Sequence, residues 1–189
     1  MKYKLILITI TASLLTFIIY HYCYHFHVNI TSINSYDSVN NYNEELSSKL
    51  TLNNNKYKLN VDFSSPNLET ENLISLIKDN TYKIQEVLHD SEVIIISIGN
   101  IDMKTENIKT ILQEYNRLLK LLRKYNNKEI IFLSPISFKN ITELKDLTHT
   151  YNIILINTSS SINNYNSLDS LTKEDANKLS NLIIKKISI

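Results

Sequence analysis

The chain has 189 residues, of which 43% are hydrophobic and 21% charged, and its formal net charge is +1. The apolar fraction is sufficient for a folded core, and the length suits one domain with an additional segment. Lysine and arginine are spread among aspartate and glutamate along the chain, which excludes the basic cluster expected of a nucleic-acid-binding protein. The single cysteine, Cys23, excludes an internal disulfide and a thiolate metal cluster, and no cofactor is expected.

The N-terminus predicts a membrane anchor. Leu5–Tyr20, "LILITITASLLTFIIY", carries no charge and follows two lysines. A bilayer core needs about 20 helical residues, so residues beside this run must contribute to the span. The flanking aromatic "HYCYHFHV" is typical of residues at the headgroup level. No small-x-small cleavage site follows the apolar run, so we expect an uncleaved anchor, with a secretory signal as the alternative. Lys2 and Lys4 favour a cytoplasmic N-terminus and a single pass, with the domain on the extracytoplasmic side.

Strand and helix patterns alternate in the rest of the chain, so we expect an anchor and juxtamembrane segment at 1–27 and one domain at 28–189. Strands are expected at residues 28–34, 57–63, 92–98, 129–134 and 152–157. Helices are expected at residues 37–50, 68–88 with a break near Asn80, 105–125, 141–151 and 172–187. Five such units with short connections predict an α/β fold, a single three-layer doubly wound domain with a mostly parallel five-stranded sheet.

This architecture indicates where a functional site lies. In open α/β sheets, ligands bind beyond the carboxyl ends of the strands. The polar loops there are at residues 35–38, 63–67, 99–103, 134–137 and 157–165.

These loops resemble the motif blocks of the SGNH (GDSL-type) esterases and O-acyltransferases, from about residue 29 to the C-terminus. The family's first block, Gly-Asp-Ser, is "YDS" here, and the resemblance implies that Ser38 is the nucleophile. The second block, Asn-x-Gly-x-Ser-Gly, matches "NVDFSS" at Asn60 and Ser64. Ser65 stands in place of the last glycine, whose backbone N–H donates to the oxyanion in the family.

The third block, Gly-x-Asn-Asp, is "GNID" at residues 99–102. Gly99 and Asp102 match it, and Ile101 stands where the family has the asparagine that donates to the oxyanion. Asn100 would supply that donor only after a shift of one residue. The resemblance therefore implies a pocket formed by Ser65, Gly99, Asn100 and Asp102.

The last block, Asp-x-x-His, supplies the family's base. The sequence "SLDSLTKEDANKL" aligns with its surroundings, which places Ser167 at the aspartate and Ser170 at the histidine. Asp169 is close but out of register, and it or Ser170 is expected to cap the last helix. One Gly and abundant Ile, Asn and Tyr are typical of an AT-rich genome, so missing glycines count less against the resemblance than this missing histidine.

A serine hydroxyl is a poor nucleophile without a neighbouring base. The histidines are His21, His25, His27, His89 and His149, which lie beside the anchor or directly before strands. His89 and His149 are therefore expected at the opposite edge of the sheet from Ser38, and no histidine is placed to serve it. Asp169 or Asp102 could accept a proton, but an ordinary aspartate pKa of about 3.9 makes it a weak base at neutral pH.

The sequence thus predicts a membrane-anchored, extracytoplasmic, SGNH-hydrolase-like (flavodoxin-like) protein that is catalytically degenerate and binds a protein or a glycan through the old active-site face. One alternative is an active serine esterase or O-acyltransferase that acts on acylated surface carbohydrate or lipid, with Ser38 as nucleophile. A second alternative is a structural component of the cell envelope. Independently of any chemistry, Asp37 and Ser38 are also preferred N-cap residues for a helix.

Overall fold

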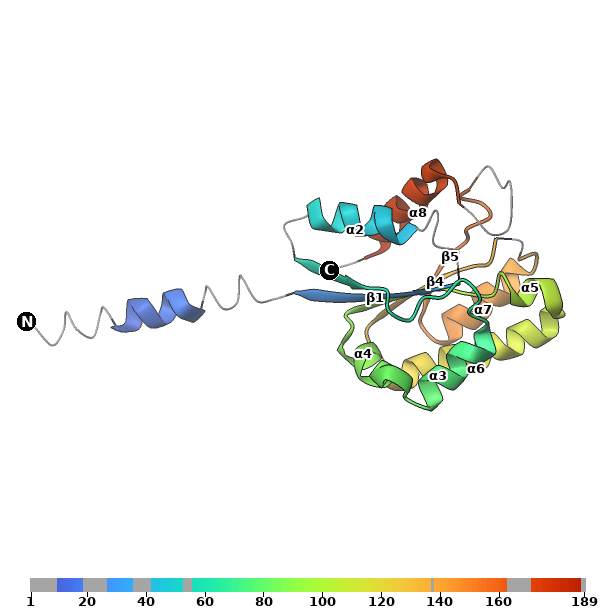
Figure 1. The fold of residues 1–189 in the computed structure, drawn as a ribbon, viewed down its shortest axis with the longest axis horizontal. Coiled ribbons are helices and arrows are strands. Elements are labelled where there is room, and N and C mark those ends of the chain that lie inside the picture. The colour runs from blue at the N-terminus through green and yellow to red at the C-terminus, as the bar shows by residue number, and fades with distance from the viewer. Residues whose placement is uncertain are drawn as a thin grey trace, which may run out of the picture.

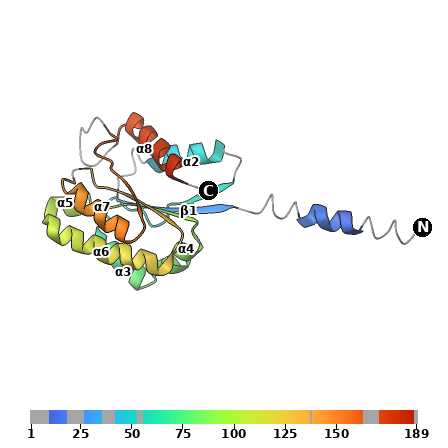
Figure 2. The ribbon, with the colours of Figure 1, turned by 180° about the vertical axis from the view of Figure 1, so that it is seen from behind.

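The computed structural model of the protein describes residues 10–18, 27–35, 42–52, 56–136, 138–162 and 171–187. From Val28 onward they form a three-layer α/β domain with a parallel sheet between two layers of helices (Figure 1 and Figure 2). The strand order is β2-β1-β3-β4-β5. The strands are β1 Val28–Asn34, β2 Tyr57–Asn60, β3 Val93–Ser97, β4 Glu129–Leu133 and β5 Ile154–Ile156. The predicted parallel five-stranded sheet is confirmed.

The helices cover both faces of the sheet, α2 and α8 on one face and α3, α4, α6 and α7 on the other (Figure 1). They are α2 Tyr42–Leu52, α3 Thr70–Lys78, α4 Ile84–Asp90, α5 Asp102–Thr105, α6 Ile108–Tyr125, α7 Ile141–Thr150 and α8 Lys173–Lys186, with the 3₁₀ turn η2 at Thr81–Lys83. Because the strands are parallel, the long helices return from the carboxyl ends of the strands to the amino ends. Their first turns therefore lie beside the strand ends.

The central strands are apolar because both of their faces are covered. Every residue of β3 is buried, and β3 pairs with β1 on one side and β4 on the other. Such burial explains why "VIIIS" is a continuous apolar run without the alternation of a half-exposed strand.

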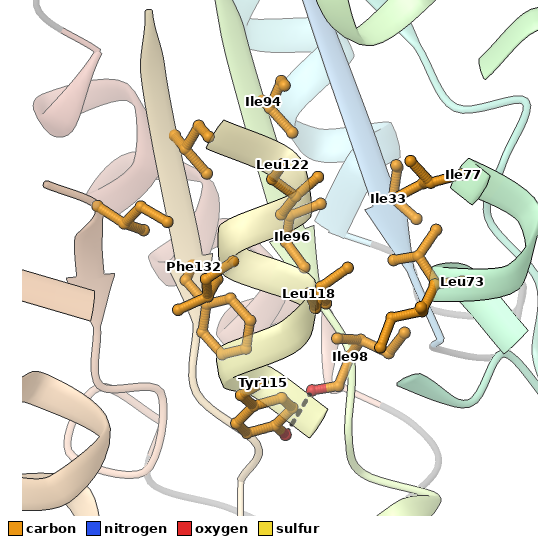
Figure 3. Close-up of a cluster of buried hydrophobic side chains, with 14 of the residues drawn as sticks. Ile33, Leu73, Ile77, Ile94, Ile96, Ile98, Tyr115, Leu118, Leu122 and Phe132 are labelled. Carbon is orange, nitrogen blue, oxygen red and sulfur yellow. Dashed lines mark hydrogen bonds between the residues drawn. The ribbon is translucent and has the colours of Figure 1, made fainter. Parts of the chain in front are cut away.

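The larger core lies between the sheet and the α3–α6 layer (Figure 3). Leu118 and Leu122 of α6 project toward the isoleucines of β3, and Tyr115 packs edge-on against Phe132 of β4, with ring centroids 5.1 Å apart. The Tyr115 hydroxyl donates a hydrogen bond to the carbonyl of Ile98, 3.2 Å away (Figure 3). The end of β3 is thereby attached to α6.

The smaller core lies beneath α2 and α8 and contains a polar contact. The Ser32 hydroxyl of β1 lies 2.8 Å from the Tyr42 hydroxyl and donates to the Asn43 side-chain oxygen at 2.8 Å. The Ser180 hydroxyl of α8 donates to the Tyr42 carbonyl at 3.1 Å. Because buried polar groups are costly unless paired, these contacts fix the first turn of α2 between β1 and α8.

Several element boundaries differ from the sequence prediction. β2 ends at Asn60 rather than at residue 63, and α6 begins at Ile108 rather than at residue 105. The predicted helix start at residue 37 lies outside the described residues. The last helix is capped by Thr172, whose hydroxyl accepts from the Asp175 N–H at 3.1 Å and donates to the Asp175 carboxylate at 2.7 Å. This reciprocal capping corrects the expected cap at Asp169 or Ser170. The predicted break near Asn80 is confirmed, since Asn80 has a φ of 51°.

Of the predicted anchor, the structure describes residues 10–18, which form a helix. Its large apolar side chains, including Leu14, Leu15 and Phe17, are mostly exposed. No helix within the described residues combines the length and the apolar character that crossing a membrane requires.

Candidate functional site

The candidate site is at the carboxyl edge of the sheet, formed by the residues that follow Asn34, Asn60, Ser97, Leu133 and Ile156. β1 connects outward to β2, whereas β3 connects in the opposite direction to β4. The ends of β1 and β3 therefore form the switch point at which ligands bind in open α/β sheets.

The loop after β2 is attached to the end of β1. The Ser64 hydroxyl accepts from the Asn34 N–H and donates to the Ser32 carbonyl, both at 3.1 Å. The Ser65 N–H donates to the Asn34 carbonyl at 3.1 Å. The backbone N–H that the resemblance assigns to an oxyanion is thus engaged within the domain.

The loop after β3 contains the glycine and asparagine of the third block. Gly99 is buried and has a φ of +102°, a conformation that side chains rarely permit. Asn100 is only 4% exposed, and its side-chain oxygen accepts from the Ile136 N–H at 3.0 Å. Its side-chain Nδ2 is buried and has no hydrogen-bond partner among the described residues. The available side-chain amide donor in this loop is therefore that of Asn100, one residue before the half-exposed Ile101 that stands at the family's asparagine position.

Asp102 has a structural contact. Its buried carboxylate accepts from the N–H of Thr70, at 3.2 and 3.3 Å, and from the Thr70 hydroxyl. A carboxylate at the first residue of α3 also complements the dipole of that helix. These contacts join the third-block loop to α3.

Two serine hydroxyls at the switch point were not singled out from the sequence. Ser35 follows β1 and Ser97 ends β3, and the Ser35 N–H donates to the Ser97 carbonyl at 2.9 Å. Both hydroxyls are buried without a partner in the part of the chain that the structure describes. The signal in the sequence that could have identified these two serines is that each is a polar residue at the end of an apolar strand. With Asn100 Nδ2, the hydroxyls give three unsatisfied polar groups, each typically costing about 1–3 kcal/mol.

The polar groups that follow β4 and β5 form hydrogen bonds with each other. The Thr158 hydroxyl donates to the Ser134 carbonyl at 2.6 Å, and the Thr158 N–H donates to the Ser134 hydroxyl at 3.1 Å. The unsatisfied groups therefore concentrate at β1 and β3 rather than along the whole edge.

The other predicted site residues, Ser38 and Asp169, lie outside the described residues, in segments 36–41 and 163–170. The described histidines, His27, His89 and His149, are exposed and lie before β1, at the end of α4 and in the last turn of α7. All three are at the amino edge of the sheet. Across the described ranges, no group of three or more His, Cys, Asp or Glu side chains could hold a metal ion.

The fold is similar to those of solved lipases and esterases. The lipase Lip_vut3 from a goat rumen metagenome superposes with a TM-score of 0.60 at 13% identity, covering 84% of this chain and 96% of the lipase. The psychrotrophic esterase EstA from Pseudoalteromonas sp. gives a TM-score of 0.62 at 12% identity, covering 86% of this chain and 100% of the esterase. AlinE4, an SGNH-hydrolase family esterase, gives 0.57 at 15% identity, covering 86% and 98%.

No protein-family model matches the sequence, and no curated protein matches it significantly. The likeness to the solved enzymes therefore concerns the fold, which is that of the SGNH hydrolases.

Proposed function

We propose that this is a membrane-anchored, extracytoplasmic protein of SGNH-hydrolase fold that is catalytically degenerate and binds a ligand at the carboxyl edge of its sheet. The position of the histidines carries the proposal. His27, His89 and His149 lie at the amino edge, and segments 36–41 and 163–170 contain no histidine in their sequence. β1 has seven residues, which span roughly 20 Å between the two edges. No described histidine can take a proton from a serine that follows β1.

The unsatisfied groups at the switch point support a binding role. Asn100 Nδ2 donates hydrogen bonds, whereas the hydroxyls of Ser35 and Ser97 both donate and accept. This combination suits neutral oxygen groups such as the hydroxyl and acyl oxygens of an acylated carbohydrate. A ligand oxygen at Asn100 would satisfy a donor that is otherwise buried and unpaired.

The sequence and the N-terminal helix support anchoring. Leu5–Tyr20 has no charged residue, and the helix at 10–18 exposes Leu14, Leu15 and Phe17. Exposing apolar side chains to water is unfavourable, and this unfavourable free energy is avoided when the helix lies in lipid. The chain leaves this segment and enters the domain at β1.

Labelling with a fluorophosphonate probe tests degeneracy. The probe modifies an activated serine, so we expect no labelling of wild type above that of Ser38→Ala. Binding is measured separately, by calorimetric titration of both proteins with an O-acetylated oligosaccharide and its deacetylated form. Equal affinity in wild type and Ser38→Ala would support the binding role. Labelling that Ser38→Ala abolishes would overturn the degeneracy.

One observation favours the alternative, an active esterase or O-acyltransferase with Ser38 as nucleophile. Asn100 Nδ2 is a buried, unpaired donor in the loop after β3, the strand that pairs with β1, and the family places an oxyanion-stabilising group in this loop. In that case wild type should release acetate from the oligosaccharide, and both Ser38→Ala and Asn100→Asp should abolish release. An unchanged oligosaccharide after prolonged incubation would exclude this alternative for that substrate class.

A further inference from the structure

The fold sorts charges that are evenly spread in the sequence. Acidic residues occupy the first turns of the helices, at Glu44, Glu45, Glu71, Asp102, Glu143, Glu174 and Asp175. Basic residues occupy the last turns of α2, α6 and α8, at Lys49, Arg123, Lys124, Lys185 and Lys186. This arrangement complements the helix dipoles. Because these helices run antiparallel to the strands, acids gather at the carboxyl edge and bases at the amino edge.

The amino edge of the sheet consists of the turns that precede the strands, together with the C-terminal ends of α2, α4, α6, α7 and α8. Its exposed lysines are Lys56, Lys58, Lys124, Lys128, Lys185 and Lys186. The acids described there are Asp90, Glu92 and Glu129. Lys128 pairs with Glu92 at 2.5 Å, and Asp90 contacts His89 at 3.0 Å. The lysines therefore exceed the acids, and this edge is basic although the chain is nearly neutral.

Two of these lysines lie over tyrosine rings. Lys56 Nζ is 5.9 Å from the centroid of the Tyr57 ring, and Lys124 Nζ is 5.0 Å from that of Tyr125. Both tyrosines are partly exposed. Lysine and tyrosine each combine an apolar body with a polar tip, and both are common where proteins meet the headgroup region of a bilayer.

The chain enters the domain at this same edge. Val28 begins β1, and the exposed His27 precedes it. From Tyr20, the last residue of the apolar segment, to Val28, even a fully extended chain reaches at most roughly 30 Å. In Figure 1, β1 begins on the side of the domain where the last helix ends, away from α5. An anchored chain therefore holds the lysines near the membrane surface.

We propose that the amino edge is a docking surface for the anionic phospholipid headgroups of the membrane in which the chain is anchored. The proposal rests on the anchoring proposed above and adds an orientation to it. With Lys56, Lys124 and Lys185 against the headgroups, the carboxyl edge and Asn100 face away from the bilayer. The ligand site is thereby directed outward, toward material outside the membrane.

Lysine footprinting of the full chain tests this orientation. The protein is reconstituted into vesicles of phosphatidylcholine alone, or of phosphatidylcholine with phosphatidylglycerol, and acetylated with a water-soluble amine reagent. We expect Lys56, Lys124 and Lys185 to react several-fold more slowly on the anionic vesicles, since each lysine near an anionic surface favours docking roughly fivefold. High salt should restore their reactivity. Exposed lysines distant from this edge, Lys109, Lys139 and Lys173, serve as internal controls and should react equally on both vesicles.

Matched charge reversals sharpen the test. Lys124→Glu with Lys185→Glu should restore the reactivity of Lys56 on anionic vesicles, whereas Lys139→Glu with Lys173→Glu should leave it protected. Equal reactivity of Lys56 on both vesicles, or protection that survives the first pair of reversals, would overturn the docking surface. Flotation of the chain with phosphatidylcholine vesicles measures anchoring independently. Failure to float would overturn anchoring and docking together, whereas flotation without protection would overturn docking alone.

Discussion

The hydroxyl of Tyr115 lies where a β-carbon on Gly99 would have to be. A Cβ built at Gly99 would be 1.7 Å from the Tyr115 hydroxyl oxygen and 3.0 Å from the Cγ of Pro135. The same hydroxyl donates to the Ile98 carbonyl, and the φ of Gly99 is +102°. Gly99 is the one glycine of the chain. Steric exclusion and backbone conformation both explain why this position has it.

Gly99→Ala should therefore destabilise the domain strongly. The methyl group must displace Tyr115 from its contact with Phe132, and the backbone must hold an unfavourable φ. Overpacking and a left-handed conformation together predict a loss of about 2–4 kcal/mol in the free energy of unfolding. Urea denaturation of wild type and variant measures it.

Tyr115→Phe provides the control for this prediction. Alone, it removes one hydrogen bond and should cost about 1 kcal/mol. Combined with Gly99→Ala, it should recover only part of the loss, because the added Cβ would still be 2.8 Å from the Tyr115 Cζ position. Full recovery in the double variant would show that the hydroxyl is the whole obstacle and that the φ of Gly99 costs nothing.

Asn100→Asp and Asn100→Ala should separate the Nδ2 donor from the contact with Ile136. The aspartate can still accept from the Ile136 N–H, but it buries a carboxylate and should destabilise the domain at neutral pH. Asn100→Ala leaves that N–H unpaired and should cost about 1–3 kcal/mol. A carboxylate in place of the Nδ2 donor repels a ligand oxygen, so affinity for the acetylated oligosaccharide should fall at least about tenfold. Asn67→Asp, an exposed change of the same charge in a loop at the same edge, should leave affinity nearly unchanged. Equal losses in both variants would remove Asn100 from the site.

Much of the fold was predictable because short-range patterns determine it. β1 and β3 were recognisable because their apolar runs are buried on both faces. β1 matches its predicted bounds, and β3 is one residue shorter at each end than predicted. The break near Asn80 was predictable because asparagine tolerates the left-handed conformation that it adopts. The helix at 108–125 follows the three-and-four spacing of its leucines.

The site was less predictable because its chemistry depends on contacts between distant residues. No motif shows that the Ser65 N–H is taken by Asn34, or that Ile136 orients Asn100 so that its Nδ2 is left unpaired. The cap at Thr172 was missed for a different reason. Asp169 is an equally good capping type, and only the geometry of the Asp175 contact decides between them.

Arg123, in the last turn of α6, is a structural residue. Its guanidinium donates to the carbonyls of Tyr151 at 2.7 Å and Lys128 at 2.5 Å, and also to that of Asn152. Burial lowers its pKa. Asn152 has a φ of 53°, so Arg123 holds a turn whose backbone is itself unfavourable.

Arg123→Met should consequently destabilise the domain by about 2–4 kcal/mol, because several hydrogen bonds from a charged group are lost and their carbonyls remain. Lys124→Met is the matched control, since this neighbouring side chain is exposed and contacts only Tyr125 among the described residues. It should change stability by about 0.5 kcal/mol or less. Thermal unfolding of the two variants provides the comparison, and similar melting temperatures would contradict the role given to Arg123.

Glu114 is a buried acid at the α3–α6 contact. Its carboxylate is 3.6 Å from the guanidinium of Arg117, which pairs more closely with Glu71 at 2.7 Å. Burial raises the pKa of Glu114 from 4.5 to about 7, and the carboxylates of Glu106, Asp102 and Glu71 add to this, whereas Arg117 opposes it. The folded domain therefore binds a proton at Glu114 more tightly than the unfolded chain does.

This difference predicts how stability depends on pH. The contribution of the protonated Glu114 is fully present below about pH 4.5 and is lost as the pH rises through about 7, because the buried carboxylate must then ionise. Glu114→Gln cannot ionise, so at about pH 8 it should be more stable than wild type, on the order of 3 kcal/mol, and similar to wild type at about pH 4. Urea denaturation across this range measures the difference, with the exposed Glu86→Gln as control. A difference between Glu114→Gln and wild type that stays constant with pH would mean that the pKa of Glu114 is the same in the folded domain and in the unfolded chain.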